Sequence, residues 1–228
     1  MNNVDFAEEV FAFIRSSRKD KLMAITFDIK SFFDNLNHKL IKDSWKRLLN
    51  YEELPDDHYN VFRNITKFSY VDIYDLFDEF KNELIARKNG NACKVAVQKL
   101  KFMRDKDIIA FCNTKDFNNR IRSKGLIKSN KKIKNEVGLL EFRNKGVPQG
   151  SPISSFLANL YLLEFDTVIN HEIMSKGGMY RRYSDDIVII CNYEDGIYFR
   201  DMILANIKEF DLEIQIKKTN SFVFYNKS

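Results

Sequence analysis

Two adjacent aspartates, Asp185 and Asp186, are the residues of this 228-residue chain whose types and spacing best suit chemistry. With Tyr183 and Ser184 they stand between Met179–Arg182 and the apolar run Ile187–Cys191, a pattern that predicts two short strands with the carboxylates at the turn. Carboxylates in contact repel each other, and a divalent cation relieves that repulsion. Their hard oxygens suit Mg²⁺, which takes few protein ligands and binds substrate phosphates as well. A solvated Asp-Asp turn explains the pair equally well, because Asp is a common turn residue.

A third carboxylate, Asp28, is expected at the end of another strand. Alternation through Leu22–Lys30 predicts a strand whose one face packs on helices, with Asp28 near its C-terminal end on the opposite face. The residues of the packed face are Met23, Ile25, Phe27 and Ile29. A sheet with an open face could bring Asp28 beside the turn of Asp185 and Asp186, so that three carboxylates share one site.

The elements that must position these carboxylates follow a recognisable order. Apolar periodicity predicts a short N-terminal helix, the Asp28 strand, a helix, a second helix after Pro152, the hairpin, a third helix and a last strand. Their expected bounds are Phe6–Ser17, Leu22–Lys30, a helix ending near Asn50, Pro152 to about Asn170, Glu194–Phe210 and Leu212–Ile216. Without residues 51–144 this order is βαββαβ, which predicts an α+β fold: a ferredoxin- or RRM-like antiparallel sheet with helices on one face.

Three segments are expected along the chain. Residues 1–50 would hold the N-terminal helix and the first part of the sheet, 51–144 an insertion, and 145–228 the rest of the sheet. The insertion is expected to be mostly helical, with Asn113–Asn135 as an exposed basic loop. The cations of that loop either face solvent or meet nucleic acid, and the sequence favours neither.

Composition narrows the class of protein. Hydrophobic residues make up 44% and aromatic residues 14%, enough to fill a core, and the net charge of +5 is a modest basic excess that allows a polyanionic partner. Three widely spaced cysteines without a CxxC pair suggest neither a disulfide framework nor a zinc site. The polar N-terminus is unlike a signal peptide, and no apolar run reaches the roughly 18 residues of a membrane span. We therefore expect a cytoplasmic protein without a membrane partner.

Four segments resemble, in order, the palm motifs of bacterial reverse transcriptases, the group that includes group II intron, retron and phage-defence enzymes. They are Phe27–Asp34, Gly146–Pro152, Tyr183–Asp186 and Lys217–Thr219. The resemblance implies a polymerase palm, interrupted by the insertion, in a bacterial RNA-directed DNA polymerase. Such an enzyme adds dNMP from dNTPs to the 3′-hydroxyl of a DNA or RNA primer on an RNA template, and anti-phage defence is one of its settings.

The resemblance also implies roles for individual residues and two Mg²⁺ ions, with Mn²⁺ as the alternative. The metal ligands would be Asp28, Ile29, Asp185 and Asp186. Lys218 would protonate or neutralise the leaving pyrophosphate, and Phe33 would lie under the sugar and reject a 2′-hydroxyl. Gln149 and Gly150 would contact the incoming nucleotide. The residues expected at nucleic acid are Arg181, Arg182, Tyr183 and Ser184. Simpler explanations exist: Phe33 as core, Lys218 as an exposed lysine, and Gln149-Gly150 as a turn.

The resemblance leaves parts of a polymerase unaccounted for. Asp28 is preceded by 27 residues, and few residues follow Thr219, so we expect incomplete fingers and no thumb. The chain would then be a fragment, an inactive relic, or a palm completed by a protein or RNA partner.

Two other classes share the predicted sheet. Nucleotide cyclases also use paired carboxylates and two metals, but they lack a Pro-Gln-Gly-Ser-Pro segment. A purely RNA-binding βαββαβ module should carry exposed aromatic residues on its central strands. Here the corresponding face carries Asp28 and the Asp-Asp turn, whose negative charge repels phosphate unless a metal is bound.

Overall fold

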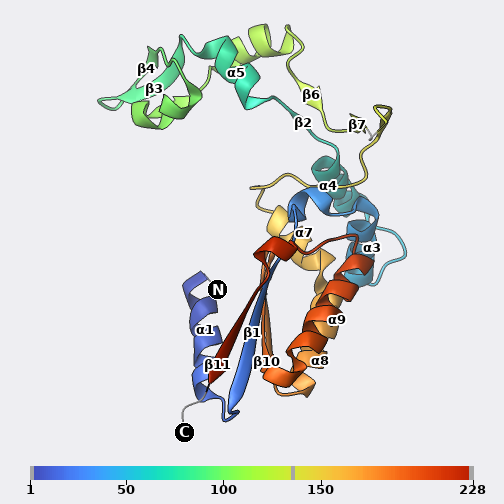
Figure 1. Ribbon diagram of the computed structural model, residues 1–228. Helices are drawn as coiled ribbons and strands as arrows, with labels where there is room; N and C mark the ends of the chain where they lie inside the picture. Colours follow the sequence, from blue (N-terminus) through green and yellow to red (C-terminus); the bar gives the residue numbers. More distant parts are fainter. Residues whose placement is uncertain (1–2, 135–136, 226–228) are drawn as a thin grey trace. The chain divides into compact units, whose positions relative to one another are not determined.

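The computed structural model describes residues 3–134 and 137–225 (Figure 1). The chain forms two compact units. Met1–Thr66 and Asn144–Ser228 make up the first, which we call the palm unit, and Lys67–Arg143 make up the second, the insertion unit. None of the described helices is long and apolar enough to cross a membrane.

The palm unit is built on a four-stranded antiparallel sheet with the strand order β11-β1-β10-β9. Its strands are β1 (Lys21–Asp28), β9 (Met179–Tyr183), β10 (Asp186–Asn192) and β11 (Asn220–Tyr225). β1 pairs with β10 from Leu22 to Asp28 and with β11 along six residues, so it lies inside the sheet. The predicted α+β palm fold with an antiparallel sheet is confirmed.

One face of the sheet packs against helices α8 and α9, which lie beside it in Figure 1. Ile25, Phe27 and Ile29 are at most 2% exposed, as their alternation predicts, because they enter the same core as the helices. The helices around this core are α2 (Phe32–Asn35), α3 (His38–Leu49), α4 (Asp56–Thr66), α7 (Ser154–Tyr161), α8 (Leu163–Ser175) and α9 (Gly196–Glu209).

Helix α1 (Asn3–Ser16) covers part of the other face, which the sequence pattern left open. Val10, Phe13 and Ile14 of this helix pack on a separate apolar cluster of the sheet. That cluster consists of Leu22, Ala24, Met179 and Ile190, at the end of the strands away from Asp28. The amphipathic pattern of the helix is thereby explained, and Asp186 at the opposite end of the face remains exposed.

Three boundaries differ from the sequence expectation. The fourth strand is Asn220–Tyr225, whereas Leu212–Ile216 forms a single bridge, between Ile214 and Ile29, and then a 3₁₀ turn η4 (Ile216–Lys218). The expected long helix after Pro152 is divided at Leu162 into α7 and α8, which leaves Phe156 and Leu163 about half exposed. Residues 51–66 belong to the palm unit, because Leu54 and Ile65 are buried in its core.

The insertion unit mixes helices with strands and is not largely helical. A three-stranded sheet, β4-β3-β5, packs with α5 on a small core of Phe77, Phe80, Leu84, Val97 and Ile121. Its elements are β2 (Ser69–Tyr70), α5 (Ile73–Phe80), β3 (Leu84–Lys88), β4 (Asn91–Val95), η1 (Leu100–Lys106), β5 (Ile108–Ala110), α6 (Thr114–Asp116), the π-helical turn η2 (Phe117–Arg122), β6 (Lys128–Ser129), β7 (Lys132–Lys134) and β8 (Leu140–Phe142). The β3–β4 hairpin turns at Asn89-Gly90, both with positive φ, and Asn-Gly is a strong sequence signal for such a turn.

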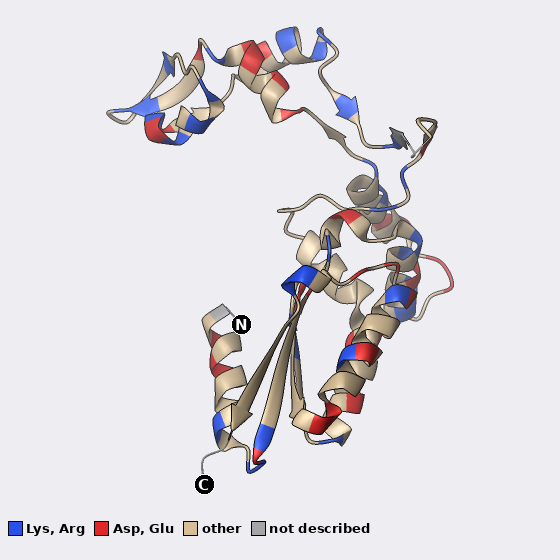
Figure 2. Cartoon of the chain, in the orientation of Figure 1, with Lys and Arg blue, Asp and Glu red and all other residues tan. Residues whose placement is uncertain are grey.

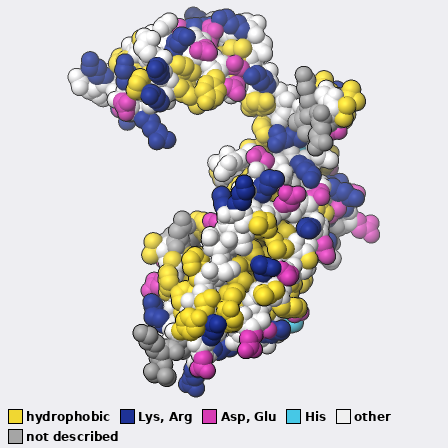
Figure 3. Space-filling view, in the orientation of Figure 1, with side chains coloured by type: hydrophobic (Ala, Val, Ile, Leu, Met, Phe, Trp, Pro, Cys, Tyr) yellow, Lys and Arg dark blue, Asp and Glu magenta, His cyan; other side chains and the backbone are white. Residues whose placement is uncertain are grey.

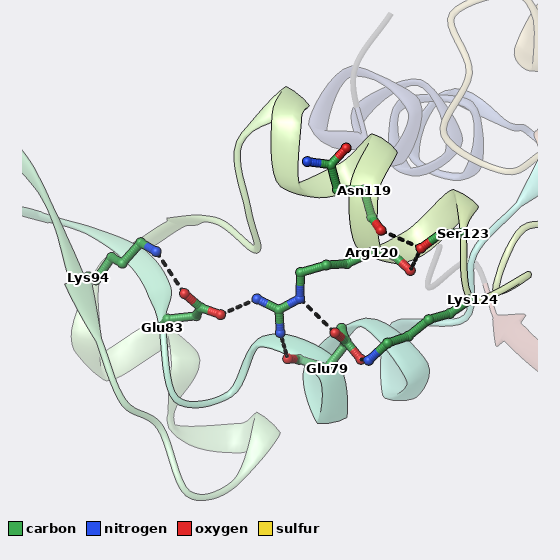
Figure 4. A network of polar contacts seen from close by, with 7 residues as sticks. All are labelled: Glu79, Glu83, Lys94, Asn119, Arg120, Ser123 and Lys124. Carbon is green, nitrogen blue, oxygen red and sulfur yellow. Dashed lines mark hydrogen bonds and ion pairs between the residues drawn. The ribbon is translucent and has the colours of Figure 1, made fainter.

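The expected basic loop is instead tied into the insertion unit (Figure 4). Arg120 donates from Nε to Glu79 at 2.7 Å and from Nη1 to Glu83, and Lys124 donates to Glu79 at 2.6 Å. Ile121 between them is fully buried. The loop expectation was therefore wrong for Thr114–Arg122, where alternate side chains serve the core and the ion pairs; Asn135 lies outside the described residues.

Candidate active site

Asp28 and Asp186 lie directly opposite each other at the neighbouring ends of β1 and β10. Residues paired in this way on antiparallel strands point to the same face, about 4.5–5.5 Å apart at Cβ. Asp185 is held beside this pair by a backbone hydrogen bond: the amide of Ile29, the residue after Asp28, donates to the Asp185 carbonyl at 2.9 Å. The sheet register thus brings together three aspartates from two distant stretches of the sequence, as expected.

The turn between β9 and β10 holds its shape through Arg182. Ser184 has a φ of 57°, a left-handed conformation that non-glycine residues rarely adopt. Arg182 donates from Nη1 to the Ser184 carbonyl at 2.9 Å and binds both carboxylate oxygens of Asp166 at 2.6 and 2.8 Å. Tyr180 donates to the same carboxylate at 2.6 Å. The residue before Asp185 is therefore anchored to helix α8 through a buried ion pair.

Burial and charge act in opposite directions on Arg182. Its side chain is 5% exposed, and burial alone would lower its pKa. The hydrogen bonds and charge of Asp166 outweigh that effect and raise the pKa, so the guanidinium stays charged. Removing one partner of such a pair leaves an uncompensated buried charge. The donors of Arg182 bind groups inside the fold in this structure, and its contact with nucleic acid stays a prediction.

The neighbouring Arg181 and Tyr183 are also engaged within the palm unit. Arg181 donates to Glu9 of α1 at 2.8 Å, and the ring of Tyr183 lies 6.3 Å from that of Phe6, edge to face. Both side chains keep about two-fifths of their surface exposed. A role at nucleic acid remains an expectation for them and for Ser184.

Lys218 lies at the carboxylates. Its Nζ donates to Asp28 Oδ2 at 2.9 Å from the 3₁₀ turn η4. This hydrogen bond, together with the negative charges of Asp28, Asp185 and Asp186, raises the pKa of Lys218. The side chain is 61% exposed while that of Asp28 is 19% exposed, so the ammonium can leave the carboxylate without disturbing the core.

The surroundings of Asp186 disfavour the charged form of its carboxyl group. Loss of solvation at the sheet surface, followed by the charges of Asp185 and Asp28, raises its pKa, and Lys218 offsets part of the rise. A group whose charged form is disfavoured by like charges gains from a cation placed between them.

A cleft of about 270 Å³ joins the carboxylates to two other predicted residues. Asp28, Asp185 and Lys218 line one part of it, and Phe33 and Gln149 line another. Phe33 is half-buried, and its carbonyl accepts from the Val147 amide at 2.9 Å, which holds the Gln149 loop beside α2. Gly150 follows with a φ of 84°, a conformation that favours glycine. Ser154, at the start of α7, donates to the Pro148 carbonyl.

The donor set suits a hard divalent cation. Carboxylate oxygens with few other protein ligands are what Mg²⁺ selects, and loss of solvation, then the charges of Asp185 and Asp28, raise the pKa of Asp186. Within residues 3–134 and 137–225, no three His, Cys, Asp or Glu side chains are already arranged around one ion position. In this arrangement Lys218 supplies the positive charge at Asp28. The Ile29 side chain is a buried hydrocarbon without a donor atom, so only the backbone carbonyl of this residue could take part.

Sequence reasoning missed the contacts that hold the site in place. Asp166, Tyr180 and Asn159 anchor Arg182, and Asn37 donates to Asp211 at 2.7 Å while capping α3. Asp166 lies in the first turn of α8, where an acidic residue is unremarkable. Periodicity marks that position as half-buried at most, so no sequence signal identified it.

Comparison with known proteins identifies the family. The family described as "Reverse transcriptase (RNA-dependent DNA polymerase)" matches residues 46–226, which include the Gln149 loop, the Asp185-Asp186 turn and Lys218 and follow Asp28 and Phe33. No curated protein matches the sequence significantly.

Solved structures resemble the fold at low sequence identity. Apo telomerase from Candida tropicalis aligns with a TM-score of 0.50 and 14% identity over 97% of this chain and 32% of that chain. Telomerase from Candida albicans in complex with a TWJ fragment of telomeric RNA aligns with a TM-score of 0.48 and 17% identity over 97% and 31%. This chain thus spans about a third of the length of these structures. On the match over most of its length, the chain belongs to the reverse transcriptase (RNA-dependent DNA polymerase) family.

Proposed function

We propose that this chain is the catalytic palm of an RNA-directed DNA polymerase, which transfers dNMP to a primer 3′-hydroxyl on an RNA template. The observation that carries the proposal is the pairing of Asp28 with Asp186 across β1 and β10, with Asp185 on the adjoining turn. Family membership supports the reaction class. The motif resemblance supports a bacterial origin and, among bacterial settings, anti-phage defence.

Asp28 and Asp185 would hold two Mg²⁺ ions, with Asp186 flanking them and the Ile29 carbonyl as a further oxygen. When bound, such ions activate the attacking hydroxyl and neutralise charge on the leaving pyrophosphate. Lys218 would exchange its contact with Asp28 for the pyrophosphate, to which it can donate a proton. Because the pKa of Asp186 is raised, its proton competes with a cation more strongly as the pH falls.

The remaining residues of the cleft would position the nucleotide. The half-buried ring of Phe33 faces the same cleft as Asp28 and Asp185, where it can support the sugar and exclude a 2′-hydroxyl. Gln149 lines that cleft from the loop before α7, and Gly150 allows the chain to turn there. Positioning and charge neutralisation supply most of the rate enhancement in phosphoryl transfer.

Primer extension tests the proposal. The chain, and the full-length product if the gene encodes more, is given a primed RNA template, dNTPs and Mg²⁺. We expect RNA-templated incorporation that Asp185→Asn lowers on the order of 10²–10³-fold, the range for the loss of one preorganised electrostatic contact. The matched control is Asp201→Asn, an exposed carboxylate on α9 that pairs with Arg200 at 3.0 Å. We expect it to keep wild-type activity.

The alternative is an inactive fragment, or a nucleic-acid-binding module that depends on a protein or RNA partner. If neither the chain nor the full-length product incorporates nucleotide on RNA or DNA templates, the polymerase proposal fails. Equal activity of wild type and Asp185→Asn would show that Asp185 is not a metal ligand of the reaction. The assignment of the chain to its family would be unaffected.

A further inference from the structure

Electric charge is divided unevenly between the two units (Figure 2). Residues 67–143 contain 18 Lys and Arg against 10 Asp and Glu, a net charge of +8. The whole chain carries +5, so the remaining residues carry −3. All of the basic excess of the protein therefore resides in the insertion unit, while the unit with the candidate active site is slightly acidic.

Carboxylates neutralise one part of the insertion unit and leave another part cationic. Glu79, Glu83 and Asp75 are engaged by basic partners at 2.6–2.7 Å, and the pKa of Glu83 is lowered to about 2 by Lys94 and then Arg120. The basic residues used in this way are Lys94, Arg120, Lys124 and Lys128, and Lys81 pairs with Asp78 at 3.3 Å. These pairs lie on α5, just before β3, on β4 and on the segment after Asn113.

A cleft of about 410 Å³ lies on the part that is left cationic. Its floor is formed by small and apolar side chains of the β3–β4 hairpin: Ala86, Cys93 and Val95. Arg87, Lys88 and Lys106 line it as well, all three exposed. Lys106 is held by a hydrogen bond from Nζ to the Ala96 carbonyl at 2.8 Å, so η1 and β4 are joined beside the cleft.

The three cations share the cleft without a counter-ion. Among the described residues of the chain, no carboxylate forms an ion pair with Arg87, Lys88 or Lys106. Figure 3 shows Lys and Arg side chains gathered around the hairpin end of this unit. Like charges held together repel one another, and a chain of phosphates relieves the repulsion along its length. The apolar floor adds a surface on which an unpaired base can lie. A duplex has no unpaired base to place there.

We propose that this cleft of the insertion unit binds single-stranded nucleic acid through its backbone phosphates, with an unpaired base against the Ala86–Cys93 floor. The cleft is lined by residues of the insertion unit, and binding there does not require polymerase activity. Backbone recognition predicts that RNA and DNA single strands bind with similar affinity, whereas a duplex binds more weakly.

Binding of a labelled 12-nucleotide oligo(U) or oligo(dT) to the full chain tests the proposal. EDTA is present, so that the carboxylates hold no metal and repel the probe. The test variant combines Arg87→Gln, Lys88→Gln and Lys106→Gln. Each single-strand phosphate contact contributes about 0.7 to the slope of log K against log salt, so we expect the slope to fall by about 2. The wild-type advantage in affinity should shrink about 16-fold between 50 and 200 mM salt.

The matched control removes the same number of positive charges, one Arg and two Lys, from the palm unit. Its substitutions are Arg15→Gln, Lys39→Gln and Lys208→Gln, all at exposed residues. We expect it to keep the wild-type slope. Equal slopes for the two triple variants would overturn the proposal, because binding would then follow net charge alone. Far-UV circular dichroism and thermal unfolding establish that both variants are folded. Binding that shifts to anionic phospholipid vesicles, with none to the oligonucleotides, would also overturn it.

A thiol footprint tests the place of binding independently of charge. Cys93 lies on the floor of the cleft, and Cys112 is half-buried elsewhere in the same unit. We expect oligo(U) to slow maleimide labelling of Cys93 by at least threefold and to leave Cys112 unchanged. Protection of both cysteines, or of neither, would contradict the proposal. Equal protection of Cys93 by ATP at the same phosphate concentration would assign the cleft to a mononucleotide and overturn strand binding.

Discussion

The palm unit and the insertion unit are held together by different means. The palm unit has a continuous apolar core that joins both central strands to α7, α8 and α9, and its main buried ion pair, Arg182 with Asp166, supports the carboxylate turn. The insertion unit buries a small core around Phe80 and Leu84, and the ion pairs of Glu79 with Arg120 and Lys124 lie beside it. The comparison teaches that the palm unit uses a buried arginine to hold the turn that carries the carboxylates, whereas the ion pairs of the insertion unit support a small core.

Truncation of one core phenylalanine in each unit should have the largest effect. Phe165 and Phe80 are each 1% exposed, and Phe→Ala in a core costs about 3–5 kcal/mol. We expect Phe165→Ala to expose the amides of β1 and β10 to hydrogen exchange. Phe80→Ala should expose β3 and β4 and leave β1 and β10 protected. Exchange of β1 and β10 in both variants would show that the units unfold together.

The adjacent arginines of β9 form ion pairs that differ in exposure: Arg182 with Asp166 is largely buried, and Arg181 with Glu9 is partly exposed. Arg182→Lys loses the two-point contact with Asp166 and the bond to Ser184, and we expect it to lower the free energy of unfolding by about 1.5–3 kcal/mol. Arg181→Lys, at a pair that is two-fifths exposed, should lower it by about 0.2–1 kcal/mol. Urea unfolding measures both.

Hydrogen exchange at the turn between β9 and β10 separates a local role of Arg182 from its effect on global stability. Arg182→Lys should speed hydrogen exchange of the Ile29 amide, which is bonded to Asp185, at temperatures where the sheet stays folded. Arg181→Lys serves as the control. Unchanged exchange at Ile29 would mean that Arg182 stabilises the fold without holding the carboxylate turn.

Each unit has a hairpin turn with a residue in the left-handed conformation. Substitutions at these two residues should change the free energy of unfolding in opposite directions. Gly90 has a φ of 80° with no atoms near an added Cβ, so Gly90→Ala should destabilise the insertion unit by about 1 kcal/mol through backbone strain alone. Ser184→Gly relieves similar strain in the palm unit, but the freer unfolded chain offsets part of the gain. We expect a net stabilisation of under about 1 kcal/mol. Thermal unfolding distinguishes the signs.

Acid should affect the insertion unit first, and by the smallest amount, because its ion pairs are exposed to solvent. The pKa of Glu83 falls from 4.5 to about 2 on folding, through Lys94 and then Arg120. A lowered carboxyl pKa stabilises the fold above about pH 4.5, and that contribution disappears as the pH falls towards 2. The protection factors of the β3 and β4 amides against hydrogen exchange should therefore fall as the pH is lowered over this interval. In Glu83→Gln this part of the pH dependence should vanish, whereas exchange in β1 keeps its wild-type pH profile.

Much of the palm could be predicted because its residues show their roles locally. The strand around Phe27, the turn at the paired aspartates and the turn at Gly150 each follow from short-range chemistry, whatever their function. The insertion was harder because short strands and one-turn helices carry little periodicity. Its clearest local signal, Asn89-Gly90, lies at the β3–β4 hairpin, within an insertion that is expected to be mostly helical. The last strand was misplaced for a related reason: Leu212–Ile216 alternates well, but Asn220–Tyr225 pairs with β1 over six residues.

The sequence by itself determined the types of the chemical groups and the elements that carry them, since alternation and turn residues act over a few positions. It determined that Asp28 ends a strand and that Asp185 and Asp186 occupy a turn. Only the tertiary structure decided that Asp28 faces Asp186, that Lys218 reaches Asp28, and that Arg182 is an internal anchor, as charge balance across distant segments depends on packing. The same reason explains the insertion unit: its basic residues are alike in sequence, and their partners in space decide which of them remain available to a ligand.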